Sequence, residues 1–172
     1  MTDFVCEPLG KHHNRELFDC GEPALNHYLA KIAGQDVKRK AAAVFVMTEP
    51  SQPARVVGFY TLSATAIELS TLPVELTKKL PRYPEVPAIL IGRLARDLAF
   101  PGVGSMLLAD ALTRCVRVAK EIAASVIVVD SKGEVATRFY KKFGFISLPK
   151  LTDRMFLPMQ IAEKLLKTKD QK

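Results

Sequence analysis

Apolar residues recur along this 172-residue chain with a period that changes from segment to segment, and these changes outline its elements. A helical period dominates residues 21–37, where one face carries Ala24, Leu25, Tyr28, Leu29 and Ile32. Residues 41–48 and 55–67 are instead rich in β-branched and aromatic side chains, and prolines stand in the link between them. We therefore expect a helix followed by an antiparallel pair of strands.

The middle of the chain predicts a loop, a central strand and a long helix. Prolines break residues 69–86, so this segment is expected to be a loop with at most a short helix at 74–80. Residues 86–100 hold a near-continuous apolar run, which predicts a central strand covered on both faces. A helix should follow, with Ser105 as its N-cap. Its apolar face comprises Leu107, Leu108, Ala111, Leu112, Cys115, Val118, Ala119 and Ile122.

The C-terminal part of the chain predicts a buried strand at 125–131, a short helix at 133–143 and a closing pair of strands at 144–148 and 154–159. A strand, a glycine turn, a helix and a strand form a right-handed βαβ unit. The pattern therefore predicts a mixed α/β (α+β) fold whose sheet is antiparallel first and parallel in the middle. We expect one domain over residues 1–166 and a polar, solvated tail at 167–172.

The charge balance favours an anionic partner, because Lys and Arg number 25 against 18 acidic residues and the net charge is +7. The sequence shows neither a secretion signal nor an apolar stretch of the roughly 18 residues that a membrane span needs, so we expect a cytoplasmic protein without a membrane partner. Three cysteines without CxxC spacing predict neither disulfides nor a zinc site. The histidines predict no metal site either.

A glycine turn, PGVGS at 101–105, stands between the predicted central strand and the following helix. Backbone N–H groups at a helix N-terminus can bind a phosphate, and Gly102 and Gly104 would allow close approach. Glycines are also the default residues of tight turns, so this stretch alone favours a purely structural role.

Further segments appear in an order that is typical of one enzyme superfamily. They are EPL at 7–9, FDCGEPALNHYL at 18–29, VVGFYTLS at 56–63, GRLARD at 92–97 and ATRFYKKFGF at 136–145. With these motifs the chain resembles the GNAT superfamily of N-acetyltransferases over nearly its whole length. More narrowly, it resembles the toxin branch, the tRNA-acetylating toxins that pair with ribbon-helix-helix antitoxins. The resemblance implies the GNAT fold, with a mixed central sheet splayed at the acetyl-CoA site and helices on both faces.

The resemblance also implies site residues, and none of them binds a metal. Tyr140 matches the general acid of the family, which serves the departing CoA thiolate; the alternative is that Tyr140 only packs in the core. The expected acetyl-CoA contacts are Leu94, Ala95, Arg96, Gly102, Val103, Gly104, Ser105, Met106 and Phe139. Basic residues could bind the phosphates of tRNA, or could simply form a solvated face; they are Arg93, Arg96, Lys38, Arg39 and Lys40.

One departure from the toxin pattern concerns the glycine turn. The toxins usually carry Gly-x-Gly-x-Gly here, whereas this chain is about two residues shorter, and Ala99 stands at the first position of the superfamily pattern. Pro101 also lacks an N–H group. Either the remaining amides suffice for the pyrophosphate, or the affinity for acetyl-CoA is reduced.

No side chain stands out as a general base, since Asp97 and Asp130 are expected only to cap or terminate strands. A lysine, with a reference pKa near 10.4, is protonated at neutral pH, whereas an α-amine near 7.7–8.0 is partly neutral. An α-amine acceptor therefore fits this site better than a lysine. Together with this preference, the resemblance to the toxin branch implies a homodimeric toxin of a type II toxin–antitoxin system that acetylates the α-amine of aminoacyl-tRNA and blocks translation. The alternatives are acetylation of a protein or small-molecule amine, and a catalytically weak module that binds an antitoxin or nucleic acid.

Overall fold

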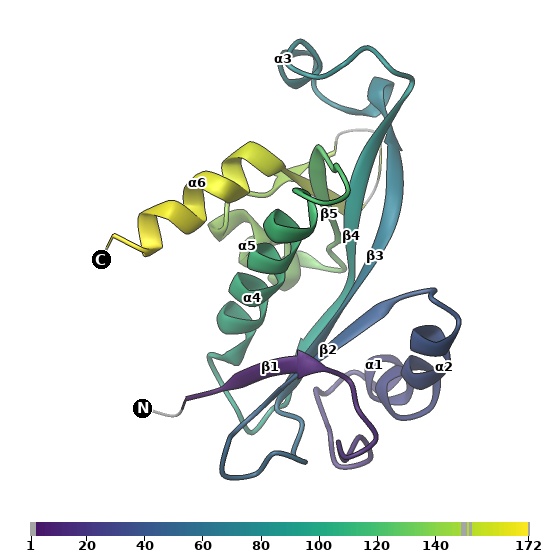
Figure 1. Cartoon of the computed structure of the whole chain (residues 1–172), viewed down its shortest axis with the longest axis vertical. Coiled ribbons are helices and arrows are strands. Elements are labelled where there is room, and N and C mark those ends of the chain that lie inside the picture. Colours follow the sequence, from purple (N-terminus) through teal and green to yellow (C-terminus); the bar gives the residue numbers. More distant parts are fainter. Residues whose placement is uncertain (1–2, 149–150, 152, 172) are drawn as a thin grey trace. The chain divides into compact units, whose positions relative to one another are not determined.

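The computed structural model describes residues 3–148, 151 and 153–171, and Figure 1 labels helices α1–α6 and strands β1–β5. The strands are β1 (Val5–Pro8), β2 (Ala43–Thr48), β3 (Gly58–Glu68), β4 (Glu85–Arg96), β5 (Val126–Asp130), β6 (Ile146–Ser147) and β7 (Arg154–Pro158). The helices are α1 (Pro23–His27), a π-helix (Tyr28–Ile32), α2 (Ala33–Lys38), a 3₁₀ turn (Leu69–Thr71), α3 (Val74–Thr77), α4 (Val103–Val118), α5 (Glu134–Lys142) and α6 (Met159–Lys169).

The strands hydrogen-bond in the order β1-β2-β3-β4-β5-β7-β6. The ladders β1–β2, β2–β3, β5–β7 and β6–β7 are antiparallel, and β4–β5 is parallel, from Ala88↔Val126 to Ile91↔Val129. A parallel pair needs a long crossover, which α4 supplies. The predicted mixed fold, antiparallel first and parallel in the middle, is therefore confirmed.

The chain divides into two compact units. The first unit comprises Met1–Ser63 and Gly92–Ala111, and the second comprises Ala64–Ile91 and Leu112–Lys172. Each unit has a hydrophobic cluster of its own. The expectation of one domain over residues 1–166 stays a prediction, which a single cooperative unfolding transition would support.

In the first unit, the helical segment at residues 23–38 buries a face that differs in part from the predicted apolar face. Leu25 is partly buried and Leu29 fully buried, as expected, but Ile32 is 40% exposed and Ala33 is buried instead. The π-helix accommodates one more residue per turn than an α-helix, so it moves the next inward position from 32 to 33. Ala24 is also exposed, in the first turn of α1.

Helix α4 differs from its prediction at both ends. It begins at Val103, so Ser105 lies within its first turn and is not the N-cap. The reason is Gly102, whose φ of +88° ends the turn one residue before the helical conformation starts. At the other end, Val118 is 41% exposed, and Ile122, beyond the helix, is 74% exposed, because the chain turns there toward β5.

Close packing at Gly58 holds the start of α4 against β3 in the first unit. A Cβ atom on Gly58 would lie 2.5 Å from Leu107 Cδ1 and 3.2 Å from Val103 Cγ1, so a side chain there would displace the helix. Leu107 and Val103 are both buried. The absence of a side chain at Gly58 therefore helps to set the position of the α4 N-terminus.

The second unit contains one expected loop and one unexpected helix. The segment at 69–84 holds only the 3₁₀ turn and α3, which confirms the predicted loop with a short helix. Helix α6 was not predicted, and it includes residues 167–169 of the expected polar tail. These three residues are exposed, as expected, but helical. Met159 and Ala162 are the buried residues of α6. Within the described ranges, the helices are all too short or too polar to cross a bilayer.

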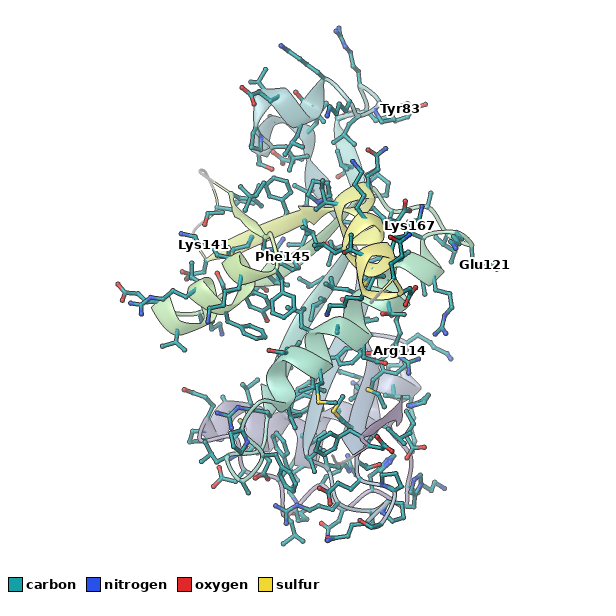
Figure 2. All side chains as sticks on the ribbon, turned by 90° about the vertical axis from the view of Figure 1, so that its left-hand side faces the viewer. Tyr83, Arg114, Glu121, Lys141, Phe145 and Lys167 are labelled. Carbon is teal, nitrogen blue, oxygen red and sulfur yellow. The ribbon has the colours of Figure 1, made fainter. Side chains whose placement is uncertain are left out.

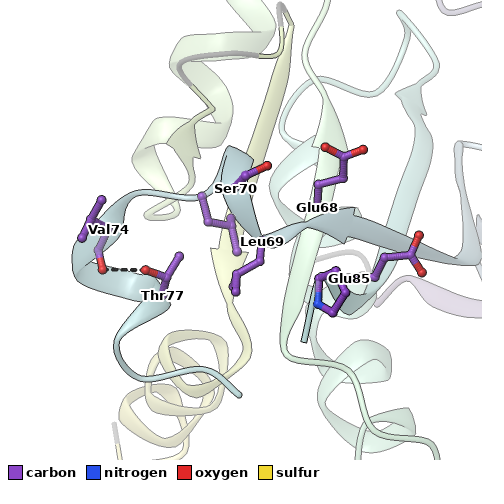
Figure 3. A pocket seen from close by; sticks show the side chains of 8 residues that line it. Glu68, Leu69, Ser70, Val74, Thr77 and Glu85 are labelled. Carbon is purple, nitrogen blue, oxygen red and sulfur yellow. Dashed lines mark hydrogen bonds between the residues drawn. The ribbon is translucent and has the colours of Figure 1, made fainter. Parts of the chain in front are cut away.

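An open pocket of about 630 Å³ lies in the second unit (Figure 3). It is lined by Glu68, Leu69, Ser70, Leu72, Val74, Thr77, Pro84 and Glu85. The Thr77 hydroxyl donates a hydrogen bond of 2.8 Å to the Val74 carbonyl at its edge. None of the predicted site residues lines this pocket.

Candidate active site

Strand β4 continues beyond its partner β5. The parallel pairing between them ends at Ile91↔Val129, and β4 runs on through residues 92–96, which belong to the first unit. This stretch contains Leu94, Ala95 and Arg96, the predicted contacts of the pantetheine arm. Backbone N–H and C=O groups beyond the end of a ladder can bind an extended ligand as if it were an added strand.

The turn from β4 to α4 has a backbone that suits a phosphate. Gly102 is exposed, its φ is +88°, and a Cβ atom placed there would meet nothing within 4 Å. The N–H groups of the first turn of a 16-residue helix follow directly, and such groups have no acceptor within the helix. The turn thus combines open space with backbone donors, so these residues fit the pyrophosphate of acetyl-CoA.

Not every predicted residue of this turn has a donor to offer. The Val103 amide donates to the Phe100 carbonyl at 3.4 Å, and its side chain is buried. Gly104, Ser105 and Met106 complete the first turn, with Ser105 and Met106 exposed. Because Pro101 has no N–H group and the Val103 amide is already bonded, the predicted anion site relies on the amides of Gly102 and of residues from Gly104 onward.

The two arginines in the apolar strand each have a partner. The Arg93 guanidinium lies 3.6 Å from the centroid of the Tyr28 ring, and the Tyr28 hydroxyl donates to Asp36 Oδ2 at 2.8 Å. Burial, together with the hydrogen bond to Asp36, raises the pKa of Tyr28 to about 12. Arg96 Nη1 donates to the Asp97 carbonyl at 3.2 Å. These contacts explain how two cations are accommodated in a half-buried strand.

The other predicted tRNA contacts are Lys38, Arg39 and Lys40, where α2 ends. All three are exposed. Lys40 has a φ of 60° and Arg39 is the C-cap of α2, so the backbone turns sharply here. Within residues 3–148, 151 and 153–171, no carboxylate forms an ion pair with any of the three. Their charges are therefore available to a polyanion.

Tyr140 lies on α5 in the second unit and is 6% exposed. Its ring makes edge contacts with Phe139 and Phe145, with centroid distances of 5.3 and 5.4 Å. Figure 2 labels Phe145 and the neighbouring Lys141, which is exposed. Burial, and to a lesser extent the charge of Asp130, raises the pKa of Tyr140 to about 12. The phenol therefore remains protonated at neutral pH.

The Tyr140 hydroxyl is free to donate, because none of the hydrogen bonds found among the described residues involves it. In that part of the chain, the only fully buried side-chain nitrogen or oxygen without a hydrogen bond is Arg55 Nε. The Tyr140 oxygen is therefore not sealed in the core. A neutral hydroxyl without a hydrogen-bond partner can donate its proton to a departing group.

The carboxylates at the ends of the two strands, Asp97 and Asp130, each have hydrogen-bond or ion-pair partners. Asp97 Oδ1 accepts a 2.9 Å hydrogen bond from the Ala99 amide, which confirms its predicted capping role, and its Oδ2 pairs with Arg55. Asp130 Oδ1 pairs with Arg154 Nε at 2.9 Å. Neither carboxylate is placed as a free general base, in agreement with the sequence-based expectation.

A cluster that the sequence did not predict brings together Glu7, His12 and His13. The Gly10 amide donates to His13 Nδ1 at 2.9 Å, so the ring proton belongs on Nε2, which donates to Glu7 Oε1 at 2.8 Å. A metal on Nε2 would require this proton to move to Nδ1, opposite the Gly10 donor. The contacts therefore favour a hydrogen-bonded cluster, which lowers the pKa of Glu7 through the bonds from His13 and His12.

Several of these partners could not be found from local patterns. Tyr28 and Arg55 lie 65 and 42 positions away from Arg93 and Asp97 respectively, and no periodicity links them. The clearest signal was the charge of Arg93 in an apolar strand, which implied a partner without naming it.

Comparison with known sequences places the chain among bacterial toxins, although no family model matches it. A probable toxin TacT of Sinorhizobium fredii is 30% identical over an alignment of 172 positions, gaps included, that covers 94% of each chain. A tRNA-acetylating toxin of Mycobacterium tuberculosis is 34% identical over 151 residues, which cover 87% of this chain and 88% of that protein.

Solved structures of similar fold include toxins with their ligands. AtaT complexed with acetyl-methionyl-tRNAfMet has a TM-score of 0.88 at 29% identity and covers 95% of this chain and 99% of its own. AtaTR bound with acetyl-CoA has a TM-score of 0.83 at 28% identity, with 95% and 98% covered. A mutant AtaT bound to the C-terminus of the antitoxin AtaR has a TM-score of 0.81 at 26% identity, again with 95% and 98% covered.

Proposed function

This chain belongs to the family of tRNA-acetylating toxins, and we propose that it transfers the acetyl group of acetyl-CoA to the α-amine of an aminoacyl-tRNA and so blocks translation. In the structure of this chain, the main support for the proposal is Tyr140, a buried ring with a free hydroxyl that stays protonated at neutral pH. The AtaT complexes with acetyl-methionyl-tRNAfMet and with acetyl-CoA support the substrates.

The reaction requires one carbon–nitrogen bond to form and one carbon–sulfur bond to break. The neutral α-amine attacks the thioester carbonyl, and Tyr140 donates its proton toward the sulfur as the C–S bond breaks. The proton lost by the amine restores the neutral tyrosine. The products are an N-acetyl-aminoacyl-tRNA and the CoA thiol.

The residues of the first unit are proposed to hold acetyl-CoA. Backbone groups of Leu94, Ala95 and Arg96 would bind the pantetheine arm, and the amides of Gly104, Ser105 and Met106 would bind the pyrophosphate. The open space at Gly102 supports this assignment. We further propose Phe139 as an apolar contact of the cofactor, since it is half-buried next to Tyr140.

The acceptor is proposed to be an α-amine because neither carboxylate at the strand ends is a free base. Asp97 and Asp130 are each paired with an arginine. A lysine acceptor would have to lose a proton held with a pKa near 10.4, while an α-amine near 7.7–8.0 is already partly neutral at pH 7.5. The exposed cations Lys38, Arg39 and Lys40, with Arg93 and Arg96, are proposed to bind the tRNA phosphates.

The partners follow from the same proposal. A mutant AtaT binds the C-terminus of its antitoxin AtaR, and we propose that this chain is likewise neutralised by an antitoxin, of the ribbon-helix-helix class. We also propose that the toxin is a homodimer and acts in the cytoplasm, where tRNA is charged. Light scattering of the purified chain, alone and with its antitoxin, would measure both assemblies.

The decisive experiment is an acetyl-transfer assay with labelled acetyl-CoA and a panel of charged tRNAs. We expect label on aminoacyl-tRNA and none on uncharged tRNA. Equal transfer to free amines or peptides, without dependence on tRNA, would instead support the alternative of a protein or small-molecule acetyltransferase. Binding of tRNA or antitoxin without acetyl-CoA binding would indicate a catalytically weak module.

A further inference from the structure

We infer that Arg55 and Asp97 are positioning residues for acetyl-CoA, acting through the turn that joins β4 to α4. The inference rests on the proposed function, because it assumes that this turn binds the pyrophosphate. Neither residue was predicted to serve the cofactor. Their role follows from a set of contacts that all lie within the first unit.

Asp97 lies buried at the start of the turn, with 3% of its surface exposed, and makes several hydrogen bonds there. Its Oδ1 accepts from the Ala99 amide at 2.9 Å, and its Oδ2 accepts from the Asp19 amide at 3.1 Å. Its own amide donates to the Val57 carbonyl at 2.8 Å, and its carbonyl accepts from the Phe100 amide at 3.1 Å. The residue therefore fixes the backbone at the beginning of the turn.

Arg55 supports the same turn at two points. Its Nη2 lies 3.3 Å from Asp97 Oδ2, and its guanidinium carbon lies 5.8 Å from the centroid of the Phe100 ring. Phe100 in turn makes an edge contact with Phe4 at 6.4 Å. The Asp97 carboxylate and the Phe100 ring therefore hold the guanidinium, while Arg55 Nε is buried without a hydrogen bond among the described residues.

Charge gives Arg55 a second role. A buried carboxylate without a cation would place a negative charge in the turn that receives an anionic pyrophosphate. The Arg55 guanidinium neutralises Asp97 and leaves the amides of α4 as the electrostatic determinant of the turn. The neutralisation of Asp97 is more important in a chain with a shortened glycine motif, because fewer backbone donors are available to offset a repulsive charge.

The test compares acetyl-CoA binding, by calorimetry, among variants of the full chain. Arg55→Met should weaken acetyl-CoA binding about tenfold or more, since it leaves the Asp97 carboxylate without a counter-charge in the turn that receives the anionic pyrophosphate. Arg55→Lys keeps the charge and should recover part of the affinity. The double variant Arg55→Met/Asp97→Asn removes both charges and should bind acetyl-CoA more tightly than Arg55→Met alone. Glu16→Gln breaks the exposed pair with Lys31 and serves as the control with unchanged affinity.

A second measurement separates positioning from general stability. Charged-tRNA binding and the thermal unfolding midpoint are measured for the same variants, and we expect Arg55→Met to change the dissociation constant of acetyl-CoA far more than that of tRNA. Equal losses for both ligands, or no loss for acetyl-CoA, would overturn the inference. If the folded parent chain itself binds no acetyl-CoA, the proposed function fails. If the parent binds acetyl-CoA and the Arg55→Met variant binds it equally well, only the inference about Arg55 fails.

Discussion

The Arg93 guanidinium stacks 3.6 Å from the centroid of the Tyr28 ring, and this contact joins β4 to the π-helical turn of the first unit. Tyr28 is 3% exposed and its hydroxyl is bound to Asp36, so the ring has little freedom to leave. The contact therefore holds the Arg93 cation, a proposed ligand of tRNA phosphates, in one position. π-Helical turns are frequent at functional sites, which is consistent with a role of this turn in positioning Arg93 for a ligand.

This contact predicts a specific coupling energy. Arg93→Gln and Tyr28→Leu should show a coupling of about 1 kcal/mol in a double-mutant cycle of unfolding free energies, because both remove the same cation–π contact. Tyr28→Phe keeps the ring and should leave that coupling intact while losing only the bond to Asp36. Urea denaturation measures each corner of the cycle. Additive effects of Arg93→Gln and Tyr28→Leu would show that the stacking contributes nothing.

The predicted tRNA contacts imply a salt dependence. Affinity for charged tRNA should fall steeply with added salt, and Arg93→Gln/Arg96→Gln should reduce the slope of log K against log salt by up to about 2, since each lost phosphate contact removes up to about one unit. Lys120→Gln/Lys167→Gln removes the same charge from exposed positions of the second unit and is the matched control. If both double variants change the slope equally, the arginines have no special role.

Loss of the Tyr140 hydroxyl should impair chemistry without impairing binding. Tyr140→Phe keeps the packing with Phe139 and Phe145, so we expect a turnover lower by roughly 10²-fold or more and an unchanged affinity for acetyl-CoA. Tyr83→Phe, at a position that is 68% exposed, serves as the control. Single-turnover acetyl transfer and calorimetry measure the two quantities. A Tyr140→Phe variant as active as the parent would leave Tyr140 with a packing role only.

The two glycines of the turn should respond differently to substitution. Gly102→Ala meets open space but forces a side chain into a φ of +88°, so it should cost about 1–2 kcal/mol and weaken acetyl-CoA binding. Gly104→Ala lies within α4 and should be better tolerated by the backbone. Gly102→Val and Gly104→Val add bulk and should both reduce binding.

Lengthening the turn tests the shortened motif directly. Insertion of Gly-Gln before Gly102 restores the length of the toxin pattern and should raise acetyl-CoA affinity, because it adds backbone donors. Calorimetry of the parent and the lengthened chain compares the two. Binding by the lengthened chain alone would show that the present turn has lost the cofactor, and binding by neither folded chain would contradict the acetyltransferase assignment.

The raised pKa values of Tyr28 and Tyr140 predict a loss of stability at high pH. Both pKa values are about 12 in the folded chain against about 10 in an unfolded one. Between these values the unfolded state binds fewer protons, so the unfolding free energy should fall as pH rises from 10 to 12, with a slope of up to about 1.4 kcal/mol per pH unit for each tyrosine. Denaturation at pH 9 and pH 11 measures this loss. The loss should be smaller in Tyr140→Phe and unchanged in Tyr83→Phe; equal losses in all three chains would contradict the prediction.

Local pattern was sufficient for most elements of this protein. β-Branched and aromatic composition predicted β2 and β3, and near-continuous apolar runs predicted β4 and β5, because side chains of these kinds favour strands and buried positions. The prolines at 69–86 predicted the loop around α3, since a proline lacks the N–H group needed in the interior of a helix or a central strand. The order of the motifs was also enough for the family, which the toxin relatives confirm.

Only the tertiary structure decided the contacts between residues far apart in the chain. The π-helix that moves the buried position from Ile32 to Ala33, the stacking of Arg93 on Tyr28 and the pairing of Arg55 with Asp97 all depend on which segments meet in space. The sequence showed that a charge in an apolar strand needs a partner, but a partner 65 positions away leaves no local periodic trace. The positive φ of Gly102 is likewise set by how the turn must join β4 to α4, and a glycine in a sequence shows only that such a φ is permitted.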